Sequence, residues 1–182
     1  QEFYPIFQNC NTVQIDSRKV EKNDLFFAFS GESFNAAKSA EDAIEKGAIA
    51  VIVELQEFEN IEKNIFYVPS TLQFLQELAQ YHRSKLSMPI IGLTGSNGKT
   101  TTKELIHAVL SAKYKVLCTA GNYNNHIGVP LTLLSIKPEH EMAVIEMGAN
   151  HQQEIAFLCE ISKPTLGYIT NFGKAHLEGF GG

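Results

Sequence analysis

The sequence predicts an α/β fold built from two successive units, a small α/β unit over residues 1–86 and the first part of a parallel-sheet domain over residues 87–182. Three observations support this prediction. Short apolar runs alternate with helix-like patterns along the whole chain, which is typical of βαβ units. A hinge-like Leu-Ser-Met-Pro segment at 86–89 separates two such blocks. A buried strand pattern then runs directly into a glycine-rich turn.

In the first block, apolar runs predict strands at 12–15, 25–29, 48–53 and 65–68. Ala40, Ala43 and Ile44 recur at helical spacing, and Gly47 is a suitable helix stop. A second helix is expected over residues 72–86. These elements would form the N-terminal domain.

In the second block, a strand at 89–95 precedes a helix at 99–112, whose residues Leu105, Ile106, Val109 and Leu110 share one face. Further strands are expected at 115–119, 142–147 and 166–170, and helices at 129–135 and 152–159. The alternation predicts a parallel sheet covered on both faces.

Composition excludes several classes of protein. A hydrophobic fraction of 44% supports a buried core, and a net charge of −5 argues against a nucleic-acid partner. No apolar run is long enough to span a membrane. The three cysteines lie far apart without C-x-x-C spacing, so buried structural thiols in a reducing compartment are expected. Without a signal-peptide pattern at the start, we expect a cytoplasmic protein.

The strongest chemical signal is the segment TGSNGKTT at 94–101, which lies between a predicted strand and a predicted helix. Glycines allow successive backbone N–H groups to point at phosphate oxygens, and the helix N-terminus adds partial positive charge. Lys99 can reach the β and γ phosphates of ATP, and the Thr100 hydroxyl can bind Mg²⁺. The ATP-binding residues are therefore predicted to be Gly95, Ser96, Asn97, Gly98, Lys99, Thr100 and Thr101. The alternative is a glycine turn before an ordinary helix.

The same segment resembles the ATP loop of the Mur ligases, the ATP-dependent amide ligases of bacterial cell-wall synthesis. Four more segments resemble motifs of this family in the same order: DSRKV at 16–20, TAGNYNNHIGVP at 119–130, VIEMGANH at 144–151 and NFGKAHLEGF at 171–180. The resemblance implies a UDP-binding N-terminal domain, a central P-loop ATPase domain of which residues 87–182 are the first part, and a C-terminal domain outside these residues.

The resemblance also implies roles for individual residues. Asp16, Ser17 and Arg18 would hold the UDP group, and Asn122, Asn124 and Asn125 would line the muramoyl-peptide site. Lys99, Glu146 and His176 would be catalytic, and Thr100, Glu146 and His176 would bind Mg²⁺, or Mn²⁺ because imidazole suits that ion better. Without the resemblance, the same residues are consistent with turn chemistry at the Asp and Asn segments, a solvated carboxylate at a strand end and a surface histidine.

The implied reaction joins D-alanyl-D-alanine to UDP-N-acetylmuramoyl-tripeptide through an acyl phosphate, in a monomer without nucleic-acid or membrane partners. The 182-residue segment alone is expected to have little or no ligase activity. Alternatives are the related ligase that adds diaminopimelate or lysine as the third residue, folylpolyglutamate synthase, a non-catalytic nucleotide-binding module, or a plain α/β domain that binds no nucleotide.

Overall fold

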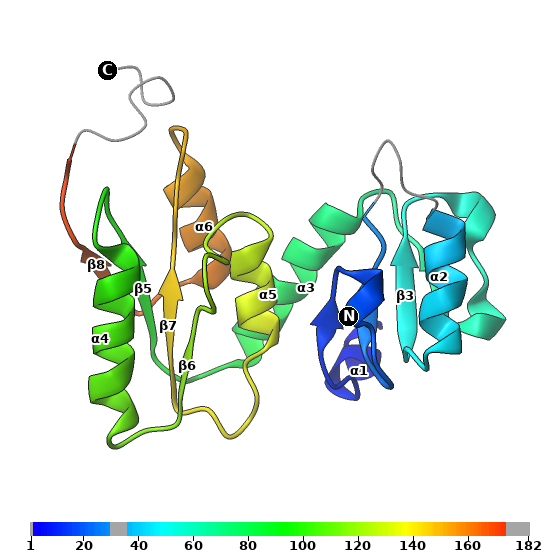
Figure 1. Cartoon of the computed structure of the whole chain (residues 1–182), viewed down its shortest axis with the longest axis horizontal. Helices are drawn as coiled ribbons and strands as arrows, with labels where there is room; N and C mark the ends of the chain where they lie inside the picture. The colour runs from blue at the N-terminus through cyan, green and yellow to red at the C-terminus, as the bar shows by residue number, and fades with distance from the viewer. Residues whose placement is uncertain (1, 30–35, 174–182) are drawn as a thin grey trace. The chain divides into compact units, whose positions relative to one another are not determined.

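The computed structural model describes residues 2–29 and 36–173, and it divides into two compact units, Gln1–Leu78 and Ala79–Gly182 (Figure 1). The division falls inside helix α3 (Thr71–Lys85), whereas the predicted boundary lies after it. The last turns of α3 bond within the second unit, since His82 Nε2 lies 3.2 Å from the Ile136 carbonyl and Arg83 Nε donates to the Ser162 carbonyl at 2.9 Å. The domain boundary at 86/87 stays a prediction.

The first unit contains a parallel four-stranded sheet in the order β1-β2-β3-β4. Its strands are β1 (Val13–Gln14), β2 (Leu25–Phe27), β3 (Ala50–Val53) and β4 (Ile65–Tyr67). Its helices are α1 (Tyr4–Gln8) and α2 (Ala36–Glu45), with the 3₁₀ turns η1 (Ser17–Lys19), η2 (Gln56–Phe58) and η3 (Ile61–Lys63). The four predicted strands and the two predicted helices all form.

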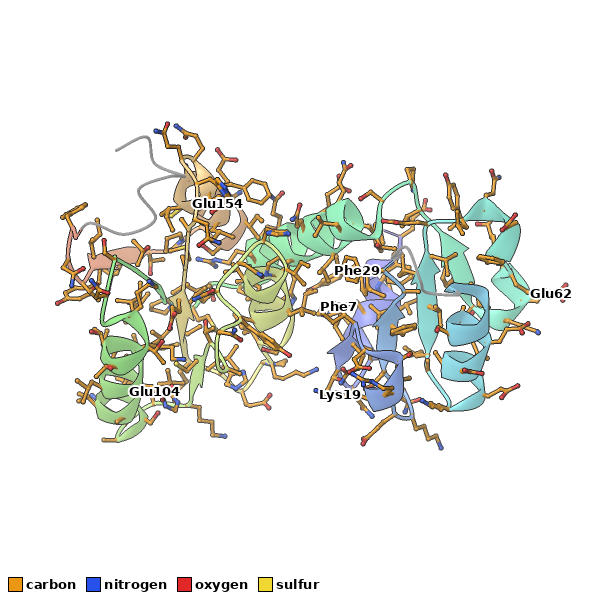
Figure 2. The ribbon with its side chains drawn as sticks, turned by 45° about the horizontal axis from the view of Figure 1, so that its top comes forward. Phe7, Lys19, Phe29, Glu62, Glu104 and Glu154 are labelled. Carbon is orange, nitrogen blue, oxygen red and sulfur yellow. The ribbon has the colours of Figure 1, made fainter. Side chains whose placement is uncertain are left out.

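Alternation along the strands produces two packed faces. Phe26 and Val51 lie in one buried cluster with Ala43 of α2. Phe27, one position along, points to the other face and contacts Phe74 of α3 with ring centroids 6.0 Å apart. Figure 2 shows the exposed Glu62 at the outer rim of this unit.

The second unit contains a parallel sheet in the order β6-β7-β5-β8. Its strands are β5 (Ile90–Thr94), β6 (Val116–Cys118), β7 (Met142–Glu146) and β8 (Leu166–Ile169). The helices are α4 (Lys99–Ser111), α5 (Gly128–Leu134) and α6 (Glu154–Ser162). Every predicted strand and helix of this block forms, within a few residues of its expected ends.

The prediction that helices cover both faces of this sheet is wrong along β8. Leu166 and Tyr168 are 60% and 51% exposed, and Leu105 of α4 is 63% exposed beside them. Together with their neighbours they line an apolar groove of about 470 Å³. The reason is that α4 packs against β5, β6 and β7 and leaves the edge strand β8 bare among the described residues.

The polar motifs meet at one edge of the second sheet. Leu93 pairs with Glu146 and Thr94 pairs with Ile169, so β5, β7 and β8 end level with one another. In open parallel sheets, ligands bind beyond the carboxyl ends of the strands where the strand order reverses. Glu146 is the last residue of β7, and the TGSNGKTT segment, the Asn-rich segment and residues 170–173 lie at or after the ends of β5, β6 and β8. Across residues 2–29 and 36–173, the helices lack the length and apolarity needed to traverse a bilayer.

Candidate functional site

The glycine-rich turn joins β5 to α4 in a conformation that requires glycine. Gly95 has φ +138° and Gly98, the N-cap of α4, has φ +76°. A Cβ atom on Gly95 would clash with the Thr170 hydroxyl, whereas a Cβ atom on Gly98 would meet open space. The turn therefore leaves room for a ligand at the N-terminus of α4, where a phosphate is favoured.

The backbone N–H groups of the turn form two sets. Some donate to Asn171, and the others have no acceptor within the described residues. Ser96 N–H donates to the Asn171 carbonyl at 3.3 Å, and Asn97 N–H donates to Asn171 Oδ1 at 3.1 Å. The N–H groups of Gly98, Lys99, Thr100 and Thr101 have no acceptor within the described residues, as is usual for the first turn of a helix. The Lys99 amino group donates to the Gly95 carbonyl at 2.8 Å.

Glu146 ends β7 as a buried carboxylate, 1% exposed. Its Oε1 accepts from Asn124 Nδ2 at 2.8 Å, and its N–H donates to Thr119 Oγ1 at 2.9 Å. Its Oε2 has no hydrogen-bond partner and lies 3.8 Å from Lys103 Nζ. A buried carboxylate oxygen without a hydrogen-bond partner is costly unless a cation approaches it.

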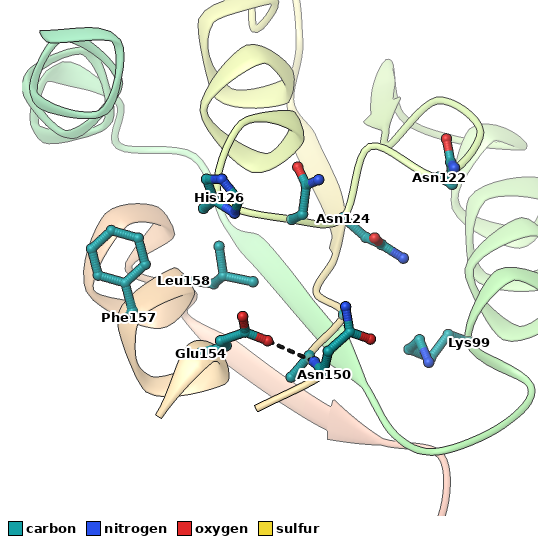
Figure 3. Close-up of a pocket in the computed structure, with 11 residues that line it drawn as sticks. Lys99, Asn122, Asn124, His126, Asn150, Glu154, Phe157 and Leu158 are labelled. Atoms are coloured by element: carbon teal, nitrogen blue, oxygen red, sulfur yellow. Dashed lines mark hydrogen bonds between the residues drawn. The ribbon is translucent and has the colours of Figure 1, made fainter. Parts of the chain in front are cut away.

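Lys99 lines a cavity of about 300 Å³ together with Asn122, Asn124 and Asn125, here called the Asn segment (Figure 3). Asn124 is bonded to Glu146, and Asn122 is exposed at the rim. Asn125 instead caps the turn before α5, because its Oδ1 accepts from Gly128 N–H at 2.9 Å. Asn125 thus holds a turn and also lines the cavity with Asn122 and Asn124.

Across the cavity from Lys99, α6 and the loop before it add residues that were not predicted (Figure 3). They include Asn150, Glu154, Phe157 and Leu158. Glu154 Oε2 accepts from the N–H groups of Asn150 at 2.6 Å and His151 at 3.0 Å. These backbone hydrogen bonds lower the pKa of Glu154, so this side of the cavity carries a negative charge at neutral pH.

In the first unit, Asp16, Ser17 and Arg18 form the start of η1. Asp16 caps the turn by accepting from Arg18 N–H at 3.1 Å, and it pairs with the Arg18 guanidinium at 2.9 and 2.8 Å. This hydrogen-bonded pair lowers the pKa of Asp16 to about 2. Lys46 adds a second cation by donating to the Ser17 carbonyl at 2.7 Å. The turn is therefore basic on balance, and its binding of UDP stays a prediction.

Comparison with known proteins adds to this geometry. The model of the Mur ligase family, catalytic domain, matches residues 9–83, and that of the Mur ligase middle domain matches residues 93–182. The chain belongs to the Mur ligase family. A UDP-N-acetylmuramoyl-tripeptide--D-alanyl-D-alanine ligase from Synechocystis is 46% identical over 92% of this chain, and one from Bacillus subtilis is 43% identical over 93%. The chain spans 37% of the length of each of these relatives.

Solved structures agree with the family. MurF from Acinetobacter baumannii matches all of this chain with a TM-score of 0.85 at 37% identity, and the chain covers 42% of it. MurF from Thermotoga maritima in complex with ADP matches 94% of the chain with a TM-score of 0.80 at 34% identity, and the chain covers 39% of it. A UDP-N-acetylmuramoyl-L-alanyl-D-glutamate--2,6-diaminopimelate ligase matches 92% of the chain, which covers 37% of it, at 23% identity and a TM-score of 0.53, which shows a shared fold alone.

The oxygen ligands that this Mur ligase segment offers fit Mg²⁺, the metal that the resemblance implies. Mg²⁺ prefers oxygen ligands and usually takes one or two carboxylates, with substrate phosphates and water completing its shell. Glu146 offers a carboxylate oxygen without a hydrogen-bond partner, and the Thr100 hydroxyl stands at the start of α4. No group of three His, Cys, Asp or Glu side chains gathers within the described residues. His176 lies outside them.

Lys103 was not predicted to belong to the site, although its side chain is fully buried there. Its amino group donates to the carbonyls of Thr119 at 2.8 Å and Gly121 at 3.3 Å, and lies 3.1 Å from the exposed Glu104 carboxylate. Its position four residues after Lys99 was an available signal, because such residues share one helix face.

The three cysteines are free thiols, as expected. Cys10 is buried, and Cys118 and Cys159 are half-buried. Burial raises the pKa of Cys118 to about 11 and raises that of Cys159 as well. Both thiols therefore stay protonated at neutral pH, which fits structural thiols rather than nucleophiles.

Proposed function

We propose that this chain is the N-terminal and central part of an ATP-dependent ligase that adds D-alanyl-D-alanine to UDP-N-acetylmuramoyl-tripeptide in peptidoglycan synthesis. The observation that carries this proposal is that Lys99, from the phosphate loop, and Asn122 and Asn124 line one cavity beside the buried Glu146. The matches to ligases of that name at 43–46% identity support the choice of reaction.

In this proposal, the N-terminus of α4 holds the ATP phosphates. The N–H groups of Gly98, Lys99 and Thr100 donate to phosphate oxygens, and Lys99 exchanges its bond with the Gly95 carbonyl for contact with the β and γ phosphates. The peptide carboxylate and ATP are both anionic, so the positive charge of Lys99 offsets their repulsion as the transferred group moves.

Thr100 and Glu146 would hold Mg²⁺, and His176 is proposed as a further ligand. Bound there, Mg²⁺ would supply charge neutralisation on the phosphates. Asn124 holds the Glu146 carboxylate in place through its 2.8 Å hydrogen bond. The side-chain amide of Asn122 is free to reach the muramoyl peptide, while the basic turn at Asp16–Arg18 would hold the UDP group.

The proposed reaction has two steps. An oxygen of the peptide's terminal carboxylate attacks the γ-phosphorus of ATP, the bond to the bridging oxygen breaks, and an acyl phosphate and ADP form. The amine of D-alanyl-D-alanine then attacks the acyl carbon, loses a proton, and expels inorganic phosphate. Since the chain spans 37% of the relatives, we propose that the D-alanyl-D-alanine site lies in the remaining part of the protein. ATP dependence and free thiols support a cytoplasmic location.

Product analysis tests this proposal. The full-length natural protein is incubated with ATP, Mg²⁺ and UDP-N-acetylmuramoyl-tripeptide, with D-alanyl-D-alanine present or absent. The products are identified by mass spectrometry. We expect a UDP-pentapeptide that forms only when the dipeptide is present. A product formed only from UDP-dipeptide and diaminopimelate or lysine would replace this proposal with the related ligase. Nucleotide binding without any amide product would favour a non-catalytic module.

A further inference from the structure

The residues that follow β8 hold one side of the TGSNGKTT segment at 94–101, here called the phosphate loop. Thr170 Oγ1 donates to the Asn97 carbonyl at 2.6 Å, and Asn171 Nδ2 donates to the same carbonyl at 3.3 Å. Asn171 also accepts from Asn97 N–H at 3.1 Å through its side chain and from Ser96 N–H at 3.3 Å through its carbonyl. One asparagine thus makes three hydrogen bonds to two consecutive loop residues.

A second contact extends this brace by two residues. Ser96 Oγ donates to the Gly173 carbonyl at 3.0 Å and lies 2.9 Å from the Gly173 N–H, which donates to it in turn. Gly95 completes the fit, because any side chain there would clash with the Thr170 hydroxyl. Residues 170, 171 and 173, here called the β8 brace, therefore define the path of the loop at 95–97.

The brace determines which loop atoms remain for a ligand. With the Ser96 and Asn97 N–H groups bonded to Asn171, the donors available within the described residues are those of Gly98, Lys99, Thr100 and Thr101. Fixing the loop before the ligand arrives removes the conformational entropy cost that binding would otherwise carry. We propose that Asn171 and Thr170 are positioning residues for the nucleoside triphosphate, and that Ser96 and Asn97 act through the brace rather than as direct phosphate ligands. This inference rests on the proposed function, because it requires ATP to bind at α4.

The test compares variants of the full-length protein in Mg²⁺-dependent binding of a non-hydrolysable ATP analogue, measured by titration calorimetry. Asn171→Ala removes two side-chain hydrogen bonds to Asn97, so the Kd should rise about tenfold or more. Thr170→Val, which loses the hydroxyl, should also weaken binding, whereas Thr170→Ser, which keeps it, should bind like the wild type. The KM for UDP-N-acetylmuramoyl-tripeptide should change less than twofold in each.

Asn60→Ala is the matched control, because Asn60 caps η3 in the first unit by accepting from Lys63 N–H at 3.1 Å. It should lower the Tm without changing the Kd for the analogue. Asn171→Ala with an unchanged Kd, or with equal increases in Kd and in the KM of the peptide substrate, would overturn the inference. A wild-type protein that does not bind the analogue would instead overturn the proposed function, so the two failures are distinguishable.

Discussion

At the scale of single residues, two lysines one helical turn apart have different tasks. Lys99 lines the cavity, and among the described residues its amino group is held by the Gly95 carbonyl alone, at 2.8 Å. Lys103 is fully buried between the carbonyls of Thr119 and Gly121 and the carboxylate of Glu146. The first lysine is placed to meet a ligand, and the second to hold the walls of the site together.

Lys99→Ala should lower the rate of phosphate release by the full-length protein at least about 100-fold, because it removes the cation that we propose stabilises charge during transfer. The measurement is a coupled phosphate-release assay at saturating substrates. Lys113→Ala, an exposed lysine beyond the other end of α4, is the matched control and should leave the rate unchanged. Equal rates in Lys99→Ala and the wild type would contradict the phosphate-loop assignment.

Lys103→Met should lower the free energy of unfolding by about 3–5 kcal/mol, because it leaves the Glu146 carboxylate buried without its neighbouring charge. Urea unfolding followed by circular dichroism measures this change. Glu104→Gln, which removes the exposed partner of the same lysine, should cost about 1 kcal/mol or less. Adding Glu146→Gln to Lys103→Met should recover part of the loss. Independent, additive effects of the two substitutions would show that the residues do not interact.

At the scale of elements, short turns are set by local hydrogen bonds. Asp16 opens η1 with a pKa lowered to about 2, chiefly through the side-chain hydrogen bonds from Arg18 and then through the Arg18 N–H. Since the folded pKa lies below the ordinary value of 3.8, the stabilisation is complete above about pH 4 and is lost as the pH falls toward 2.

An NMR titration of the Asp16 carboxyl tests this assignment. Arg18→Gln should raise the pKa of Asp16 toward 3.8, although not fully, because the backbone N–H of residue 18 remains. Lys19→Gln should raise it less, since Lys19 acts only through its charge at a distance. A pKa that stays at about 2 in Arg18→Gln would remove the Asp16–Arg18 pair as its cause.

The start of α5 depends on a close approach between two backbone segments. A Cβ atom on Gly128 would collide with the backbone of Tyr123, so Gly128→Ala should destabilise the protein by about 1–3 kcal/mol. Gly167→Ala in β8 is the control, because no atom lies within 4 Å of its added Cβ, and it should be neutral within about 0.5 kcal/mol. Denaturant midpoints give both values. Similar midpoints for the two variants would contradict the close packing of the Asn segment on α5.

At the scale of the whole molecule, alternating apolar runs and glycine stops were enough to predict the strands and helices of both units and the parallel sheet of the second. Helix α1 was missed because five residues are too short to show a helical period, although Pro5 at its start is a known signal. The meeting of the site motifs of residues 94–173 at one edge of the second sheet was not predicted, although each motif lies at or after the end of a predicted strand.

The covered face of α4 could not be predicted from hydrophobicity. The buried or half-buried positions are Lys99, Thr102, Lys103, Ile106, His107 and Leu110, whereas Leu105 and Val109 are 63% and 73% exposed. A lysine at the centre of a buried face contradicts the usual amphipathic pattern, and only the carbonyls and carboxylate that surround it in three dimensions explain its position. The Asn171 brace was missed for a related reason, since its partners lie 74 and 75 residues earlier in the chain.

The central claim is that a peptide carboxylate and ATP react directly in the cavity between Lys99 and the Asn segment. The most direct test labels the terminal carboxylate of UDP-N-acetylmuramoyl-tripeptide with ¹⁸O and follows the label in the full-length protein. An acyl phosphate requires that one ¹⁸O atom appear in the inorganic phosphate released when D-alanyl-D-alanine is added. Released phosphate without the label would mean that water attacks ATP, and would contradict the account.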